Sequence, residues 1–324
     1  MSTVADLAQA VRAGDRRALS KAITLLESLR EEDRVAARAL LTLLASPSTP
    51  TFRIGVTGVP GAGKSTLLDG LGLLAIAAGR RVAVLAVDPS SRQSGGSVLG
   101  DKTRMTRLSV STGAFVRPSP SLGVLGGTAG RTRELILLCE AAGYDLVFVE
   151  TVGVGQSEEL VASMVDCVLL VLLAGAGDEL SSMKRGVLEA ADVIAFNKAD
   201  GEHASAVENE AAALRASLGI SRGSRVPPVL ALSALTDTGI AELWTALMQQ
   251  QRDAEETGEF VARRSGQRKA WFESALDDAL REVFLHRPDL VSARVAAERQ
   301  VQSGAQPPWE AAQRLVTELL PPRR

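Results

Sequence analysis

Apolar residues between positions 51 and 250 fall into short continuous runs, separated by longer stretches in which they recur at helical spacing. These runs predict strands at 54–57, 82–87, 146–150, 168–172, 193–196 and 229–232. Most consist of successive Val, Leu and Ile residues, which is typical of strands buried on both faces of a parallel sheet. The repetition of strand and helix therefore predicts an α/β fold with a doubly wound, mostly parallel sheet.

Helical patterns without strands flank this region on both sides. Apolar residues recur at helical spacing from Leu7 to Leu29, and a proline-containing linker follows near residue 48. Beyond residue 253 we expect a long amphipathic helix over 270–285 and two shorter helices after it. The predicted regions are an N-terminal helical region over 1–48, the α/β domain over 51–250 and a C-terminal helical region over 253–324.

Composition excludes some classes of partner. The chain has 324 residues, of which 46% are hydrophobic and 23% charged, and its formal net charge is -2. Charges of both signs are mixed along the sequence, so no basic stripe indicates a nucleic-acid partner. The short basic stretch over 263–269 is interpreted as a solvated helix face rather than a binding patch.

Cysteine usage and the apolar runs indicate a reducing compartment. Cys139 and Cys167 lie far apart in apolar surroundings, so we interpret them as buried residues and not as a disulfide or metal site. The most hydrophobic run, over 167–174, has the length of a strand and not of a membrane span. Residues 1–18 carry several charges and lack the apolar core of a signal peptide. We therefore expect a cytoplasmic protein without a membrane partner.

The first predicted strand ends in a glycine-rich turn that matches the Walker A pattern, Gly58, four residues, then Gly63-Lys64-Ser65. Backbone N–H groups in such a turn surround a β-phosphate, and the following helix adds a favourable dipole. Lys64 is expected to reach the β- and γ-phosphates, and the Ser65 hydroxyl to bind Mg²⁺. The predicted phosphate-binding residues are Gly58, Val59, Pro60, Gly61, Ala62, Gly63, Lys64, Ser65 and Thr66.

Acidic residues follow the next strands at positions suited to a magnesium site. Asp88 and Glu150 end two strands, and Asp101 lies in the polar loop between them. Because carboxyl ends of parallel strands line the ligand crevice, we expect these groups beside Ser65. An acid at a strand end can instead form a turn or cap a helix, and the sequence leaves open which carboxylate touches the ion directly. Gly153 can donate its N–H to the γ-phosphate or simply serve a tight turn.

A second motif predicts which base is bound. Asn197-Lys198-Ala199-Asp200 follows a strand, as the guanine motif Asn-Lys-x-Asp does. The Asp200 carboxylate can accept hydrogen bonds from guanine N1–H and the exocyclic amine, whereas adenine offers no matching donors, so GTP is predicted over ATP. The Lys198 stem can cover the ring. The companion loop, whose backbone N–H groups are expected to meet guanine O6, comprises Ser233, Ala234 and Leu235.

The motifs together resemble a known family. The sequences VDPSS at 87–91, GDKTRM at 100–105, VETVGVGQSE at 149–158 and GAGDEL at 175–180 resemble MeaB/ArgK proteins, the bacterial relatives of human MMAA. The resemblance implies a P-loop GTPase that chaperones an adenosylcobalamin-dependent acyl-CoA mutase, typically methylmalonyl-CoA mutase. Such chaperones gate cofactor loading from an adenosyltransferase and protect or rescue the mutase. They are homodimers with helical arms, which makes the region over 253–324 the expected dimerisation arm.

The resemblance also assigns roles to residues. Lys64 and Ser65 become phosphate and Mg²⁺ contacts, while Asp88, Asp101 and Glu150 form the magnesium-linked acidic set. Segments 101–105, 151–158 and 175–186 become switch segments, the third being particular to this family. Lys184 and Arg185 are candidates to supply positive charge during hydrolysis, although a solvated helix start explains them equally well. The chain has no Asp-x-His-x-x-Gly motif, so the partner, and not this chain, is expected to hold cobalamin in that mode.

Other functions stay open at this point. Isobutyryl-, ethylmalonyl- or 2-hydroxyisobutyryl-CoA mutase are alternative clients. A kinase of an amino-acid transport system would need a phosphoacceptor pocket and a phosphoprotein product. A nickel-insertion GTPase would need Cys/His clusters, which the sequence lacks. A dimeric scaffold that binds GDP without turnover would not need the full acidic set.

Overall fold

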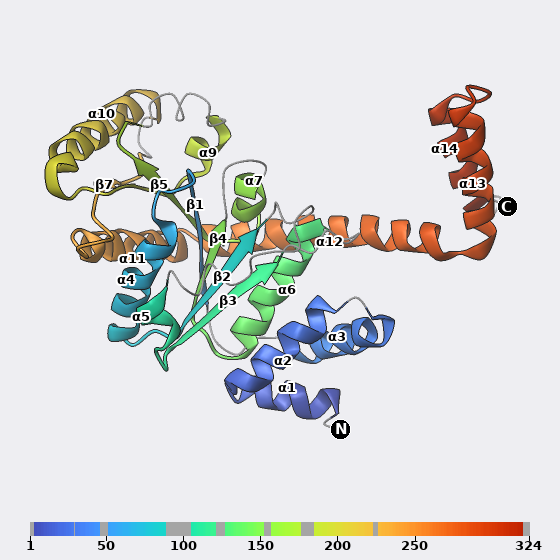
Figure 1. Ribbon diagram of the computed structural model, residues 1–324, viewed down its shortest axis with the longest axis horizontal. Helices are drawn as coiled ribbons and strands as arrows, with labels where there is room; N and C mark the ends of the chain where they lie inside the picture. Colours follow the sequence, from blue (N-terminus) through green and yellow to red (C-terminus); the bar gives the residue numbers. More distant parts are fainter. Residues whose placement is uncertain are drawn as a thin grey trace. The chain divides into compact units, whose positions relative to one another are not determined.

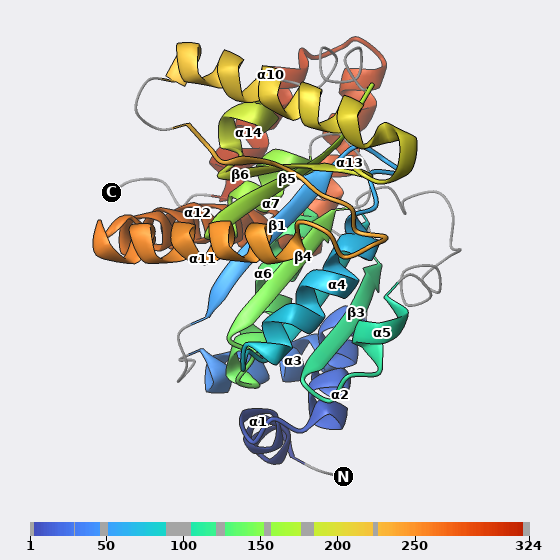
Figure 2. The same cartoon turned by 90° about the vertical axis from the view of Figure 1, so that its left-hand side faces the viewer.

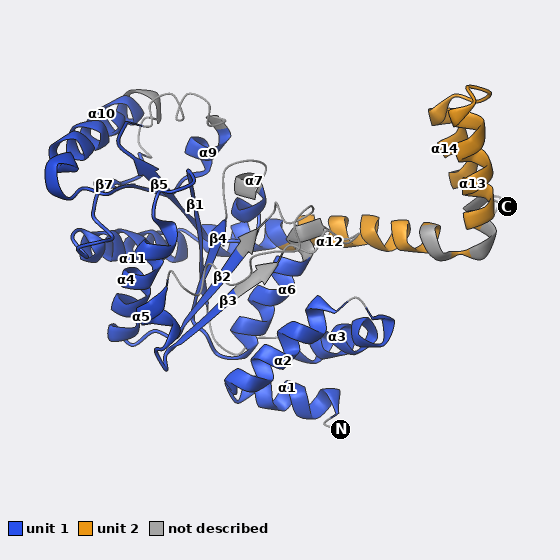
Figure 3. Ribbon diagram, in the orientation of Figure 1, with its two compact units in different colours: residues 1–267 blue, residues 268–324 orange. Residues whose placement is uncertain are grey.

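The computed structural model describes residues 3–28, 30–45, 51–88, 105–120, 127–151, 157–175, 185–222 and 226–319. The chain forms two compact units, residues 1–267 and residues 268–324, which are coloured separately in Figure 3. The division predicted from the sequence, with regions over 1–48, 51–250 and 253–324, stays a prediction. Each unit is described by itself below.

A parallel sheet of seven described strands forms the centre of the first unit, in the order β3-β2-β4-β1-β5-β6-β7 (Figure 1). The strands are β1 (Phe52–Gly58), β2 (Val82–Asp88), β3 (Ala114–Pro120), β4 (Leu146–Thr151), β5 (Cys167–Leu173), β6 (Val193–Asn197) and β7 (Val229–Ala231). The predicted α/β fold with a parallel, doubly wound sheet is confirmed. The sequence prediction missed β3, because Arg117, Pro118 and Pro120 interrupt its apolar pattern; prolines are tolerated there since β3 is an edge strand.

Helices cover both faces of this sheet, as Figures 1 and 2 show. They are α1 (Val4–Arg12), α2 (Arg16–Glu27), α3 (Glu31–Leu44), α4 (Lys64–Ala77), α5 (Thr106–Ser109), α6 (Gly127–Ala141), α7 (Ser157–Ala162), α9 (Arg185–Ala190), the short η1 (Gly201–His203), α10 (Ala204–Arg222), α11 (Ile240–Glu256) and the beginning of α12 (Glu259–His286). Strands β2, β3 and β4 contribute alternate residues to two cores. In β4, Leu146 and Phe148 belong to one core, while Val147 and Val149 belong to the other.

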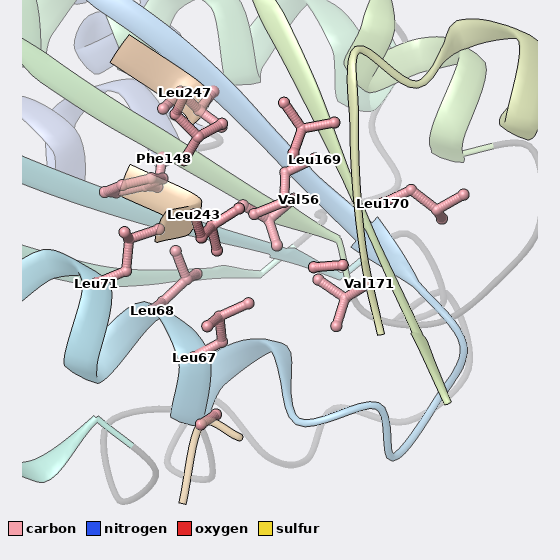
Figure 4. Close-up of a cluster of buried hydrophobic side chains, with 14 of the residues drawn as sticks. Val56, Leu67, Leu68, Leu71, Phe148, Leu169, Leu170, Val171, Leu243 and Leu247 are labelled. Atoms are coloured by element: carbon pink, nitrogen blue, oxygen red, sulfur yellow. The ribbon is translucent and has the colours of Figure 1, made fainter. Parts of the chain in front are cut away.

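The core on the α4 and α11 face supports the end of β1 that leads into the glycine-rich turn. Figure 4 shows Leu67 and Leu68 of α4 and Leu243 of α11 directed toward Val56 and Phe148 of the sheet. All five side chains are fully buried. Because α4 begins immediately after the turn, this packing fixes the position of the turn relative to the strands.

The N-terminal helices pack on the other face, over α6. Asp15 precedes α2 and accepts hydrogen bonds from the first backbone N–H groups of that helix, which explains where α2 begins. Leu19 and Ile23 are fully buried in the shared core. Arg117 of the edge strand β3 forms a 2.5 Å ion pair with Glu27 of α2, so these helices also hold the edge of the sheet. Leu29, part of the predicted pattern, lies outside the described residues.

The beginning of α12 is held by partly buried ion pairs, which corrects an expectation from the sequence. Arg263 donates to both carboxylate oxygens of Asp192, at 3.1 and 3.2 Å. Arg264 donates to both oxygens of Asp166, at 2.8 and 2.7 Å. Their side chains are only 29% and 17% exposed. The interpretation of this basic stretch as a solvated face is therefore wrong for these two arginines.

The second unit consists of the remainder of α12 with α13 (Pro288–Gln302) and α14 (Pro308–Leu319). Its small core contains Ala297, Ala311 and Leu315. Along α12, by contrast, the large apolar side chains of Phe272, Leu276, Leu280 and Val283 are exposed. Across the described residues of both units, no helix combines the length and the apolar character that crossing a membrane requires.

Candidate nucleotide-binding site

The glycine-rich turn connects β1 to α4 at the carboxyl end of the sheet, and the structure shows why two of its positions require glycine. Gly58 has φ 147°, and a Cβ there would lie 2.0 Å from the carbonyl oxygen of Val171 in β5. Gly63 precedes α4 with φ 84°, in the left-handed region. A side chain at either position would strain the backbone, and at Gly58 it would also collide with the neighbouring strand.

Lys64, the first residue of α4, turns its ammonium group back into this turn. Its Nζ donates to the carbonyl oxygens of Gly58 at 2.7 Å and Val59 at 3.1 Å. The residue is only 7% exposed. A cation is thus held beside the N-terminal end of a helix, where both the charge and the helix dipole favour an anion.

Ser65 and Glu150 lie next to each other although 85 positions separate them in the sequence. The Ser65 hydroxyl donates to Glu150 Oε1 at 2.7 Å, and both residues are buried. This brings together a hydroxyl and a carboxylate, the hard oxygen ligands that suit Mg²⁺. The described residues contain no group of three or more Asp, Glu, His or Cys side chains arranged for a metal. Asp101 and the side chain of Asp88 lie outside the described part, so the predicted acidic set is placed only at Glu150.

Asn197 connects the glycine-rich turn to the companion loop. The residue ends β6 and is 2% exposed. Its amide nitrogen donates to the carbonyl oxygen of Ala62 at 2.7 Å, and its amide oxygen accepts the N–H of Ala234 at 2.9 Å. A Cβ at Gly63 would lie 2.5 Å from this amide nitrogen, which gives a second reason for glycine there. The spacing between the turn and the loop is therefore set by one buried side chain.

Asp200 is held by the same loop. The Ser233 hydroxyl donates to Asp200 Oδ1 at 2.6 Å, and Ser233 is fully buried. Lys198 has φ 66°, a left-handed conformation that is uncommon for lysine, and is exposed. Leu235 has a side chain that is 78% exposed. Since the Ala234 N–H is donated to Asn197, the expected contact of loop N–H groups with guanine O6 stays a prediction.

Several predicted residues cannot be placed. Gly153 and Lys184 lie outside the described residues, and so does most of each predicted switch segment. The third of those segments begins at Gly175, whose N–H donates to Glu210 Oε1 in α10 at 2.7 Å. The second begins at Thr151, whose hydroxyl donates to the Thr57 hydroxyl oxygen at 3.1 Å. The starts of both segments are thus hydrogen-bonded to α10 and β1, respectively.

The sequence prediction missed an ion-pair cluster beside the site. Arg107 of α5 pairs with Asp69 of α4 and with Asp237, which follows the companion loop. The contacts join positions 38 and 130 residues apart, so no local spacing signals them. The proximity of Arg107 to the 100–105 motif was the one available indication.

Comparisons with known proteins agree with this geometry. A family model described as "Methylmalonyl Co-A mutase-associated GTPase MeaB" matches residues 19–289. A probable GTPase of Mycobacterium tuberculosis is 47% identical over 317 residues, covering 97% of this chain and 94% of that protein. A mitochondrial methylmalonic aciduria type A homolog of Mus musculus is 42% identical over 316 residues, covering 94% of this chain and 76% of that protein.

A solved structure shares both fold and sequence. The crystal structure of a LAO/AO transport system kinase matches with a TM-score of 0.74 and 34% identity, covering 98% of this chain and 97% of that one. The extent of these matches leaves no part of the described nucleotide site outside the shared region. The chain therefore belongs to the MeaB family of methylmalonyl-CoA mutase-associated GTPases, the family that its motifs resemble.

Proposed function

We propose that this chain binds GTP with Mg²⁺, hydrolyses it to GDP and phosphate, and thereby controls an acyl-CoA mutase. The observation that carries the proposal is the pair of hydrogen bonds made by Asn197. They join the glycine-rich turn at Ala62 to the companion loop at Ala234. A phosphate-binding turn and a base-binding loop held at a fixed spacing form a site for one nucleotide.

Guanine selection rests on Asp200. Ser233 holds one carboxylate oxygen at 2.6 Å and thereby orients the group. An oriented carboxylate can accept from guanine N1–H and from the exocyclic amine, while adenine would leave it without a donor. The described residues thus support GTP over ATP.

Hydrolysis would be an in-line attack of water on the γ-phosphorus. Lys64, already directed into the turn, would offset the charge of the β- and γ-phosphates. Bound Mg²⁺, held through Ser65 together with Asp88, Asp101 and Glu150, would neutralise charge that develops on the phosphate oxygens. We further assign Gly153 as a γ-phosphate contact and Lys184 as a source of positive charge.

Exchange of Asp200 for Asn tests the base assignment. We expect Asp200→Asn to weaken GTP binding by at least about a hundredfold, because an amide N–H would then face guanine donors. XTP binding should improve, since xanthine carries a carbonyl oxygen where guanine carries its amine. Calorimetry with GTP, XTP and ATP measures all three affinities. Asp253→Asn, an exposed position on α11, is the matched control. Equal losses for GTP and ATP, without a gain for XTP, would show that Asp200 does not select the base.

The client is proposed to be methylmalonyl-CoA mutase, with isobutyryl-, ethylmalonyl- and 2-hydroxyisobutyryl-CoA mutase as alternatives. Family membership supports this role, which includes gating of adenosylcobalamin delivery from an adenosyltransferase in the cytoplasm. Phosphate release should be slow for the chain alone and faster once the correct mutase is added. A mutase that binds the chain but leaves GTP turnover unchanged would remove this proposal.

We also propose that the family's homodimer forms through α12. Phe272, Leu276, Leu280 and Val283 are 67%, 47%, 59% and 49% exposed. At about 100° per residue they fall within about 80° of one another around the helix, so they form one apolar face. Light scattering should report a dimer for the natural chain and a monomer for Leu276→Glu combined with Leu280→Glu. Val110→Glu, at an apolar position that is 80% exposed, is the control.

The transport-system kinase has less support. The solved relative carries that name, but the family model and the Mycobacterium tuberculosis relative are both named as GTPases. A kinase would transfer the γ-phosphate of labelled GTP to a protein, whereas a GTPase would release it as free phosphate. The same assay separates turnover from a GDP-binding scaffold, which would release none.

A further inference from the structure

A single arginine connects three parts of the domain beside the nucleotide site. Arg107 Nε donates to Asp69 Oδ2 in α4 at 2.7 Å. Its two terminal nitrogens donate to the carboxylate oxygens of Asp237, at 2.9 and 3.2 Å. Asp237 belongs to residues 233–239, here called the base loop. The guanidinium therefore bridges the helix that follows the glycine-rich turn and the loop that holds Asp200.

The α4 side of this bridge is buried and makes a second hydrogen bond. Asp69 is 5% exposed, and its second oxygen accepts the backbone N–H of Leu108 at 2.8 Å. Asp69 thus holds both the side chain and the backbone of α5. Gly72 of α4 leaves room for this contact, since a Cβ there would lie 2.6 Å from a methyl carbon of Leu108.

Gly70 of α4 leaves room for the Asp237 side chain in the same way. A Cβ at Gly70 of α4 would lie 2.6 Å from Asp237 Oδ1 and 2.8 Å from Ile240 Cδ1. Asp237 has φ 56°, a left-handed conformation that a non-glycine residue adopts only when its surroundings hold it. The hydrogen bond from Arg107 lowers the pKa of this carboxyl group, as expected of an ionised partner. Among the described residues, Arg107 is the cationic side chain that pairs with the Asp237 carboxylate.

The base loop is held at its other end by the residues assigned to guanine. Ser233 donates to Asp200 and Ala234 donates to Asn197. Ser233 and Thr238 also pair across the loop, with the Ser233 N–H donating to the Thr238 carbonyl oxygen at 2.9 Å. Asp237 and the Ser233 hydroxyl that contacts Asp200 thus belong to one short hydrogen-bonded loop.

We propose that Arg107 is a positioning residue for guanine recognition, which holds the base loop against α4 so that Ser233 keeps the Asp200 carboxylate in place. The proposal rests on the proposed function, because it assumes that Asp200 binds the base. Arg107 acts through Asp237 and the loop without touching the nucleotide. Its loss should therefore weaken binding of the base and leave binding of the phosphates intact.

Comparison of GTP with inorganic tripolyphosphate tests this proposal, because only GTP carries a base. For Arg107→Gln, we expect GTP affinity to fall about tenfold, the scale of one lost ion pair with hydrogen bonds. Tripolyphosphate affinity, measured by competition with a fluorescent nucleotide, should change less than about twofold. Asp237→Asn keeps the contact between Arg107 and Asp69 and should show the same selective loss of GTP affinity. The double variant with Arg107→Gln and Asp237→Asn should lose little more affinity than either single variant. Arg34→Gln, in an exposed pair with Glu31 on α3, is the control.

Each outcome decides the proposal. Equal losses of affinity for GTP and tripolyphosphate would show that Arg107 supports α4 and the phosphate turn. Unchanged affinities in both variants would show that the bridge is dispensable. Either result overturns this inference but leaves the proposed function standing. A natural chain that binds tripolyphosphate but does not prefer GTP over ATP would overturn the proposed function as well. Arg107→Lys separates charge from geometry: an ammonium cannot bridge both carboxylates in the same way, so partial recovery is expected.

Discussion

The buried ion pair at the beginning of α12 gives a stability prediction that the sequence alone would not suggest. Arg264 forms a two-point contact with Asp166, whose side chain is only 2% exposed. Its guanidinium also lies over the ring of Phe260, 4.4 Å from the centroid. Arg264→Met removes the charge and retains an apolar side chain that can cover the same ring. The substitution therefore keeps the packing on the ring and removes the ion pair, together with the hydrogen bond from Arg264 to the Thr51 carbonyl oxygen.

The expected loss of unfolding free energy depends on the hydrogen bonds that Asp166 keeps in Arg264→Met. Removing one partner of a buried pair costs about 3–5 kcal/mol, because the other charge stays buried. Asp166 Oδ2 still accepts the backbone N–H of Arg53 at 2.8 Å, so the lower end of that range, about 3 kcal/mol, is expected. Lys269→Met is the matched control on the same helix. Lys269 is 79% exposed and lies 4.0 Å from Glu273, so its loss should cost less than about 0.5 kcal/mol.

Urea unfolding followed by circular dichroism measures both free energies. Adding Asp166→Asn completes a double-mutant cycle, in which we expect a coupling energy of about 2 kcal/mol between positions 166 and 264. Stabilities of Arg264→Met and Lys269→Met that agree within error would refute the reasoning. A coupling energy near zero would refute it independently, since it would assign the loss to something other than this pair.

Three further predictions follow from single contacts. Lys64→Ala should abolish GTP binding in calorimetry while the circular dichroism spectrum is kept, because the ammonium group lies in the turn itself, where it donates to the carbonyl oxygens of Gly58 and Val59. Gly58→Ala should lower the free energy of unfolding by more than about 3 kcal/mol. Gly79 is the control, because it has φ 87° and open space where a Cβ would lie; Gly79→Ala should cost only the backbone strain of about 1 kcal/mol. Burial raises the pKa of the Cys139 and Cys167 thiols, so a thiol reagent near neutral pH should label neither in the folded chain and both in urea.

The sheet and the glycine-rich turn between β1 and α4 could be predicted because their signals are local. Continuous apolar runs marked six of the seven described strands, and the spacing of Gly58, Gly63 and Lys64 marked the turn. The guanine motif was equally local; the contacts of Asn197 and Asp200 with the companion loop were not predicted, and the role of these residues in binding the base stays a prediction. Each of these signals depends on residues close together in the chain, which is the information that a sequence pattern carries.

The missed features depend on contacts between distant positions. Arg263 and Arg264 were interpreted as solvated because their acidic partners lie 71 and 98 residues earlier in the chain. Arg107 pairs with Asp237 130 residues later, and apart from the neighbouring 100–105 motif nothing in either local sequence distinguishes the pair from ordinary surface charges. In strand β3, Pro118 opposed the assignment, and only its place at the edge of the sheet makes it acceptable.

The two ends of β1 contact different parts of the domain: one lies near the ion pairs of α12 and the other near the proposed nucleotide site. The distance between them decides whether a change in α12 affects nucleotide binding. At the start of β1, the Arg53 N–H donates to Asp166, which holds Arg264, whereas Gly58 at the other end opens the glycine-rich turn proposed to bind phosphate. The strand has 7 residues, so these ends lie about 20 Å apart. At that distance a unit charge contributes less than about 1 kcal/mol to another at effective dielectric constants near 20 or above. Arg264→Met should therefore lower stability without changing GTP affinity more than about fivefold. A folded Arg264→Met protein that loses GTP binding would mean that the strands transmit a displacement, because charge alone is too weak at this distance.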